Sequence, residues 1–203
     1  MSAGAALRYV ALGDSYTIGT SVAEAERWPN QLVRVVPELG LIANLAVNGF
    51  TSRDVIEAEL PRLQALQPEF VTLLIGVNDV VQGVAPETYR ANLRLILDDL
   101  VRRVGAERIV LVTTPDYTVT PQGAEYGDPA ERSAAIRAFN DILGEVALVF
   151  GIRVVDVYDV SLGAATDQSL VAVDGLHPSG AQYALWVERI APVVLELLVE
   201  EAH

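Results

Sequence analysis

The sequence contains no cysteine and no lysine, and each absence excludes a set of reactions. Without cysteine there are no disulfides, thiolate nucleophiles or thiolate metal ligands. All 14 basic residues are arginine, so the chain has no lysine for a Schiff base, for attachment of pyridoxal phosphate or for a phosphate-binding loop. The chemistry of this protein must therefore rest on other side chains.

Histidine is almost as scarce, because the chain has only His177 and His203. A metal centre built from several histidines is not expected, although carboxylates alone could still hold magnesium. We expect no cofactor and no bound metal. The groups left for catalysis are serine, threonine, aspartate, glutamate, tyrosine and one internal histidine.

Long hydrophobic runs are also missing. No stretch reaches the ~18 uncharged apolar residues of a membrane-spanning helix, and the first residues, "MSAGAAL", lack the basic leader of a signal peptide. These features predict a soluble, cytoplasmic protein. The net charge of −13 argues against nucleic acids and acidic membrane surfaces as partners.

What the chain does have is a regular alternation of short apolar runs and longer amphipathic runs. This order is typical of a parallel sheet with helices on both faces, and the length favours one domain over residues 1–203. The predicted strands are 8–12, 41–47, 70–75, 108–112 and 152–157. The predicted helices are 28–39, 52–66, 86–104, 128–150 and 179–201. The pattern predicts an α/β protein with a three-layer α/β/α sandwich.

Two of these segments have special features. In 52–66 we expect Ser52 to cap the helix and Pro61 to kink or divide it. The segment 113–129 fits neither helix nor strand and is rich in proline, glycine, threonine and tyrosine. Loops of this length are often functional, but a surface excursion explains the composition equally well.

Polar residues and glycine follow four of the predicted strands. Because ligands of open parallel sheets bind at the carboxyl ends of the strands, these residues could converge in space. They are Asp14 and Ser15 in "GDSYTIG", Gly49 in "NGFTSRD", Asn78 and Asp79 in "GVNDVVQG", and Asp174 and His177 in "VDGLHPSG". Taken alone, each group also fits an ordinary turn or helix cap.

Taken together, the groups form a coherent chemical set. A serine nucleophile, Ser15, needs a base that titrates near neutral pH, and His177 is the only internal histidine. Asp174 lies three residues upstream, where it can orient the imidazole. The developing oxyanion needs neutral donors, which the backbone N–H groups of Ser15 and Gly49 and the side-chain amide of Asn78 could supply.

With these four blocks in this order, the sequence resembles the SGNH hydrolases, the GDSL esterase/lipase family. Ser15, Gly49, Asn78 and His177 match the four residues that name the family, and Asp174 matches its Asp-x-x-His arrangement. The resemblance spans residues 13–178. It implies a flavodoxin-like fold with a five-stranded parallel sheet in the order 2-1-3-4-5. It also implies hydrolysis of carboxylic esters through a covalent acyl-enzyme.

The sequence also predicts roles for further residues. Tyr16 stands where the family usually has leucine, so we expect it to affect substrate fit. Asp14 is interpreted as a neighbour that shapes the turn, and Asp79 as a support for the asparagine loop. In the long segment 113–129, Tyr117 and Tyr126 could wall a substrate pocket.

Other hypotheses remain open at this point. Within the same family, the substrate could be a short-chain acyl or acetyl ester, an acetylated sugar, a lysophospholipid or an acyl thioester. A flavodoxin-like module could instead hold a phosphate or flavin on "GDSYTIG", although Asp14 and the acidic composition oppose this. In a third hypothesis, Asp14, Asp79 and Asp174 converge on magnesium. A fold that has lost its activity fits poorly, because every residue of the set is present.

Overall fold

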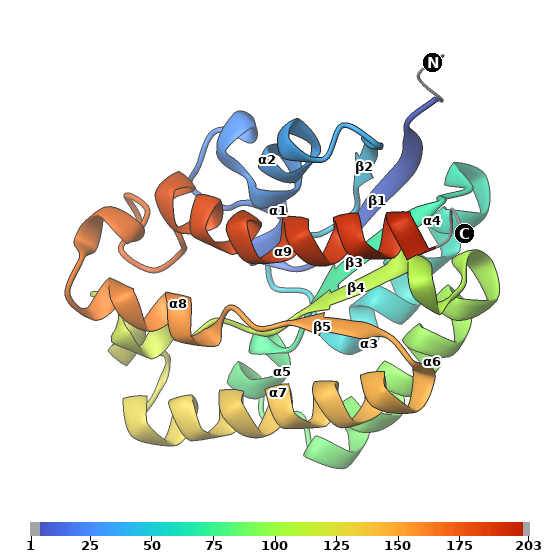
Figure 1. Ribbon diagram of the computed structural model, residues 1–203. Coiled ribbons are helices and arrows are strands. Elements are labelled where there is room, and N and C mark those ends of the chain that lie inside the picture. The colour runs from blue at the N-terminus through green and yellow to red at the C-terminus, as the bar shows by residue number, and fades with distance from the viewer. Residues whose placement is uncertain (1–4, 201–203) are drawn as a thin grey trace.

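The protein is described from a computed structural model, which defines residues 5–200, with only the backbone for Glu200. Its strands form one parallel sheet in the order β2-β1-β3-β4-β5 (Figure 1). This confirms the predicted sheet and its 2-1-3-4-5 order. The strands are β1 (Leu7–Gly13), β2 (Leu39–Asn44), β3 (Phe70–Leu74), β4 (Ile109–Val112) and β5 (Arg153–Val155).

Helices cover both faces of the sheet, as Figure 1 shows. On one face α2 (Trp28–Val35) packs against α9 (Gly180–Glu200), and on the other α6 (Pro86–Val104) packs against α7 (Pro129–Phe150). The three-layer α/β/α arrangement is therefore confirmed. None of the helices between residues 5 and 200 is long and apolar enough to cross a membrane.

Several shorter helices fill the connections, and the sequence pattern did not predict them as separate elements. The short α-helices are α1 (Ser15–Ile18), α3 (Ser52–Asp54), α4 (Leu60–Leu66), α5 (Val77–Val81) and α8 (Tyr158–Leu162), with a π-helical turn at Val55–Glu59. Short 3₁₀ turns lie at Glu24–Glu26, Ala106–Arg108, Tyr117–Val119, Gly123–Tyr126, Gly163–Ala165 and Gln168–Leu170. One or two turns carry too few residues for a detectable helical period.

The middle of the sheet forms the core of the protein. In the central strands β1, β3 and β4, residues 9–12, 70–74 and 109–112 are almost completely buried. Both faces of these strands are covered by helices, which explains why their sequences are apolar throughout and not alternating. Trp28 of α2 and Trp186 of α9 are fully buried and fill the helix layer over one face.

Several predicted boundaries were displaced, and the strand predicted at 152–157 is shortened to 153–155. The helix predicted at 28–39 ends at Val35, because Pro37 disfavours the helical conformation at Val36, whose φ and ψ are −122° and 80°. The strand predicted at 41–47 runs from 39 to 44. Beyond it, the N–H groups of Leu45 and Val47 still donate to the Ala11 and Gly13 carbonyls of β1 at 2.8 and 3.3 Å. The Asn44 side chain accepts a hydrogen bond from the intervening Ala46 N–H at 3.2 Å.

The segment predicted as a helix at 52–66 is divided ahead of Pro61, as expected. The π-helical turn at Val55–Glu59 separates α3 from α4. Pro61 has no N–H to donate back to a carbonyl of this turn, so the regular helical pattern is interrupted here. The prediction that Ser52 caps this helix was wrong. Thr51 is the N-cap, and its N–H donates to the Asp54 carboxylate at 2.8 Å. Ser52 is instead the first helical residue.

Candidate active site

Ser15 lies at the start of α1, directly after β1. Gly13 ends the strand with φ +143°, and a Cβ there would lie 2.2 Å from the carbonyl oxygen of Leu74. Only glycine therefore lets the ends of β1 and β3 approach each other at this turn. Asp14 is the N-cap of α1 and accepts a hydrogen bond from the Tyr16 N–H at 3.0 Å. The turn holds Ser15 at the edge of a pocket that the residue lines.

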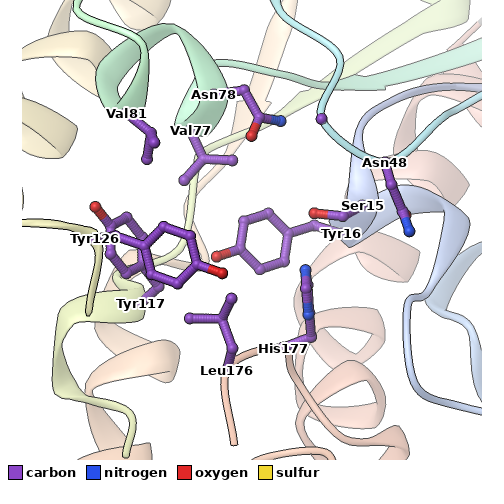
Figure 2. A pocket seen from close by; sticks show the side chains of 11 residues that line it. Ser15, Tyr16, Asn48, Val77, Asn78, Val81, Tyr117, Tyr126, Leu176 and His177 are labelled. Atoms are coloured by element: carbon purple, nitrogen blue, oxygen red, sulfur yellow. The ribbon is translucent and has the colours of Figure 1, made fainter. Parts of the chain in front are cut away.

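His177 and Asp174 lie in the loop before α9. The Nδ1 atom of His177 is 2.6 Å from Oδ2 of Asp174, so the imidazole keeps its Nε2 atom for another partner. Oδ1 of Asp174 accepts the N–H groups of Leu176 and His177 at 2.9 and 3.0 Å. In Figure 2 the His177 ring points towards Ser15, and both residues line the same pocket.

Hydrogen bonds keep Asp174 ionised. Burial raises the pKa of this carboxyl, but the hydrogen bonds from Ser21, Leu176 and His177 outweigh burial and lower its pKa to about 2. At neutral pH the side chain is therefore a carboxylate. A carboxylate in this position can stabilise a positive charge on His177.

Gly49 and Asn78 line the same pocket. Gly49 follows β2 and has φ +83°, a backbone conformation that favours glycine, and a Cβ there would meet no atom within 4 Å. Asn78 belongs to α5 and donates from Nδ2 to the Phe50 carbonyl at 2.8 Å. Since an amide nitrogen carries two hydrogens, the second remains for a ligand in the pocket.

Asp79 connects these two loops. Its carboxylate accepts the N–H of Ser52 at 2.9 Å and the hydroxyl of Ser52 at 2.5 Å, and Asn92 of α6 donates to the same hydroxyl at 2.9 Å. Asp79 is fully buried and does not line the pocket. The residue fixes the loop that carries Gly49 to the helix that carries Asn78.

The remaining pocket wall is mainly apolar. Tyr117 and Tyr126, from the long segment after β4, pack edge to face with ring centroids 5.8 Å apart, and both line the pocket. Val77, Val81 and Leu176 complete this side, seen on the left and below in Figure 2. The cavity has a volume of about 190 Å³.

Tyr16 also lines the pocket and is 3% exposed. Its ring packs against the His177 imidazole with centroids 5.6 Å apart, and against Trp186 at 6.4 Å. Burial raises its pKa well above the usual value, with the charge of Asp14 acting in the same direction, so its hydroxyl stays neutral. The aromatic ring therefore supports the histidine and also shapes the pocket.

Buried carboxyls lie behind the serine turn. Glu59, from the π-helical turn, accepts the Gly13 N–H at 3.0 Å and is 1% exposed, and Asp14 is fully buried. Burial raises the pKa of each carboxyl to about 8. The nearby charge of Asp79 also raises the pKa of Asp14, and the charge of Asp14 also raises the pKa of Glu59. Both side chains are thus mostly protonated at neutral pH.

Sequence reasoning did not identify Glu59, although a signal was present. Val55 and Leu63, four residues before and after it, are apolar and buried, so Glu59 stands in the core-facing stripe of the segment. A carboxyl in such a stripe indicates a specific partner. Ser21, which donates to Asp174 at 2.7 Å, was also missed, and nothing in the local sequence indicates this contact.

The magnesium hypothesis finds no support in this arrangement. Among the residues that the structure defines, no group of three or more carboxylate, histidine or cysteine side chains could hold a metal ion. Asp174 faces His177, whereas Asp14 caps α1 and Asp79 binds Ser52. The phosphate-cradle hypothesis is no better supported, because the N-terminus of α1 is already capped by the Asp14 side chain.

The fold and the pocket together are those of a serine-type ester hydrolase. A model of the GDSL-like Lipase/Acylhydrolase family matches residues 11–185, which is most of the chain. The chain belongs to this family and is a carboxylic ester hydrolase. The resemblance predicted from the four sequence blocks is therefore confirmed.

Individual relatives agree with this assignment. The chain is 26% identical over 200 residues to "Esterase TesA" of Pseudomonas aeruginosa, and the match covers 96% of this chain and 90% of that protein. It is 32% identical over 110 residues to "Thioesterase 1/protease 1/lysophospholipase L1" of Escherichia coli, and the match covers 54% of this chain and 52% of that protein. The crystal structure of Axe2, an acetylxylan esterase from Geobacillus stearothermophilus, shares the fold with a TM-score of 0.72, 22% identity and 96% coverage of both chains.

Proposed function

We propose that this protein hydrolyses esters of short-chain carboxylic acids through an acyl-enzyme on Ser15. One observation carries the proposal. Four segments that are distant in the sequence contribute Ser15, Gly49, Asn78 and His177 to a single pocket, and His177 is bonded to Asp174 behind it. These are the parts that acyl transfer by a serine requires.

In the first half of the reaction, Oγ of Ser15 attacks the ester carbonyl carbon. Nε2 of His177 takes the hydroxyl proton, because Nδ1 is already bonded to Asp174. The tetrahedral intermediate then collapses, and His177 returns the proton to the departing alcohol. In the second half, His177 activates a water molecule, which attacks the acyl carbon and releases the acid from Ser15.

The oxyanion of each tetrahedral intermediate needs neutral donors that are already in place. In this proposal the backbone N–H groups of Ser15 and Gly49 and the second amide hydrogen of Asn78 donate to it. The amide of Asn78 is held by its hydrogen bond to the Phe50 carbonyl, so little reorganisation is needed during the reaction. The neighbouring acids Asp14 and Glu59 act as mostly uncharged supports of the serine turn.

The pocket favours a small apolar acyl group. Its volume of about 190 Å³ is below the roughly 300–1,000 Å³ that is usual for sites of drug-sized ligands. Tyr117, Tyr126, Val81 and Leu176 offer apolar contacts on one side, which suits acetyl, propionyl or butyryl groups. The reaction as written uses protein side chains and water, so we expect activity without added metal or cofactor.

A second candidate substrate class is the acyl thioesters, which the same mechanism would cleave. The observation in its favour is the similarity to the Escherichia coli protein, whose name includes a thioesterase and a lysophospholipase. That match covers only 54% of this chain, so we rank oxygen esters first. The two classes are separated by the salt titration described below.

The proposal is tested by hydrolysis of p-nitrophenyl acetate and butyrate by the purified protein in the presence of a chelator. Ser15→Ala and His177→Ala should each lower kcat by several orders of magnitude, because nucleophile and base act as a unit. A serine-directed phosphonate should label the wild-type protein once, at Ser15, as read by peptide mass spectrometry. Ser169→Ala, a change at an exposed serine, is the matched control and should keep full activity. Full activity in Ser15→Ala would overturn the mechanism.

Two further expectations from the sequence stay predictions. We propose a cytoplasmic location and a single domain over residues 1–203. The expected partner is a small-molecule ester, in keeping with the family.

A further inference from the structure

The segment that leaves α1 contacts both of the other loops of the pocket. After the Gly19 C-cap, Thr20 donates from Oγ1 to the Asn48 side chain at 2.5 Å, next to Gly49. The following residue, Ser21, donates from Oγ to Oδ2 of Asp174 at 2.7 Å. Two consecutive side chains thus tie the serine turn to the glycine loop and to the histidine loop.

Ser21 holds the particular carboxylate oxygen that faces the histidine. Oδ1 of Asp174 is bonded to two backbone N–H groups of its own turn, whereas Oδ2 receives only His177 Nδ1 and the Ser21 hydroxyl among the contacts of the defined residues. Two donors on Oδ2 restrict rotation of the carboxylate. The same hydrogen bond contributes to the low pKa of Asp174.

The backbone of Ser21 is in a conformation that L-residues rarely adopt. Its φ is +64°, and among residues 5–200 only Gln67, with φ +45°, is another non-glycine residue with positive φ. Glycine would occupy this exposed position without strain, so serine needs a compensating interaction. The hydrogen bond to Asp174 is the one interaction of its side chain that the structure shows.

We propose that Ser21 is a positioning residue for the reaction described above, and that its hydroxyl holds Asp174 so that Oδ2 stays aligned with Nδ1 of His177. The proposal rests on the proposed function. Ser21 does not line the pocket and does not touch the reacting atoms. Its loss should therefore slow turnover and leave substrate binding nearly unchanged.

The test compares three substitutions that all tolerate a positive φ. Ser21→Gly removes the hydroxyl and relieves the backbone strain, Ser21→Asn keeps a side-chain donor, and Ser21→Asp is nearly isosteric with asparagine but lacks a donor. With p-nitrophenyl acetate, we expect kcat to fall roughly tenfold in Ser21→Gly, the effect of losing one hydrogen bond to a charged group. KM should stay within about twofold in every variant.

The asparagine and aspartate variants separate a hydrogen-bonding role from a structural one. Ser21→Asn should keep kcat within about threefold of wild type, and Ser21→Asp should fall below Ser21→Gly because it repels Asp174. Gln67→Gly, at the other positive-φ position and not among the residues that line the pocket, is the matched control and should leave kcat unchanged. Circular dichroism of each variant checks that the fold is retained.

Two outcomes would overturn the proposal: wild-type kcat in Ser21→Gly, or equal losses in Ser21→Asn and Ser21→Asp. Ser15→Ala, measured in the same series, identifies which proposal has failed. If Ser15→Ala keeps its activity, the proposed function itself is wrong. If Ser15→Ala is inactive while Ser21→Gly is fully active, only the role of Ser21 is wrong.

Discussion

At the scale of single residues, the pocket depends on polar groups whose hydrogen bonds leave selected atoms free. Asn78 uses one amide hydrogen on the Phe50 carbonyl, and His177 uses Nδ1 on Asp174. The atoms left over, an amide hydrogen and Nε2, are the ones that the proposed reaction needs. A hydrogen bond to one atom of such a group fixes the direction of its free atom, because planar amide and imidazole groups have rigid geometry.

Replacing Asn78 with alanine should lower kcat by roughly 10²–10³-fold, the usual effect of removing one oxyanion donor. The change in KM should be much smaller, because the donor acts on charge that develops only in the transition state. Steady-state kinetics on p-nitrophenyl butyrate measure both constants. A variant that binds more weakly but turns over normally would assign Asn78 to substrate positioning.

Glu59 and Asp14 should make the stability of the protein depend on pH. The pKa of Glu59 is about 8 in the folded state against 4.5 ordinarily, so between these values the folded state holds more protons than the unfolded chain. The free energy of unfolding should therefore be highest below pH 4.5 as far as this group is concerned. It should fall by about 1.4 kcal/mol per pH unit up to pH 8 and then level off.

Glu59→Gln should remove that part of the slope while keeping an acceptor for the Gly13 N–H, and Asp14→Asn should act in the same pH window. Urea unfolding at pH 5, 6, 7 and 8 measures the slope for each variant. If both variants keep the wild-type slope, neither carboxyl carries a proton in the folded state.

At the scale of elements, the segment 113–129 is a fixed wall and not a loose excursion. Asp116 is 2% exposed and accepts hydrogen bonds from the Ser133 hydroxyl at 2.6 Å and the Tyr158 hydroxyl at 2.7 Å. These donors come from α7 and α8, so two helices anchor the segment just before Tyr117. Of the two interpretations left open by the composition, the structural contacts favour the functional one.

This wall should set the acyl-chain preference. Tyr126 is 41% exposed and lines the pocket, so Tyr126→Ala should open that side without disturbing the core. We expect kcat/KM for p-nitrophenyl octanoate to rise relative to acetate by roughly tenfold, since a longer chain gains apolar contact. Tyr126→Phe keeps the ring and is the matched control, with an unchanged ratio. An unchanged ratio in Tyr126→Ala would show that the acyl chain lies elsewhere.

At the scale of the whole molecule, charge is the property that bears on substrate choice. The net charge of −13 should repel anionic substrates at long range. Arg132 places a positive charge beside the pocket wall. Its guanidinium donates to the Val80 carbonyl at 2.7 Å, next to Val81, which lines the pocket. Arg132 therefore competes with the field of the whole chain.

A salt titration should reveal whether repulsion by the net negative charge or attraction by Arg132 dominates. We expect kcat/KM for an acyl-coenzyme A, which is anionic, to rise as salt is added, because the Debye length falls from ~30 Å at 0.01 M to ~8 Å at 0.15 M. The value for a neutral ester should barely change on the same preparation. A falling rate for the coenzyme A ester would show that the arginine side attracts it, and would put thioesters first among the substrates. Arg132→Gln would then abolish the fall.

Much of the fold was predictable from the sequence, because local patterns encode local structure. Continuous apolar runs indicated buried parallel strands, and Pro86 and Gly105 marked the helix that the structure places at residues 86–104. The missing cysteine and lysine together with the single internal histidine narrowed the chemistry, and four short blocks indicated the family. All of this depends on residues that are neighbours in the chain.

Contacts between distant segments set how these pieces meet. Ser21 and Asp174 are 153 residues apart, and Glu59 reaches Gly13 from 46 residues away, so no local pattern encodes either contact. Short helices and loop conformations depend on what packs around them, since one turn of helix is not stable alone. Local sequence patterns were enough to identify the available side chains and the strand ends on which they stand. Packing of the layers determined which atoms of those side chains face one another, because burial and hydrogen bonding between distant segments select one loop arrangement.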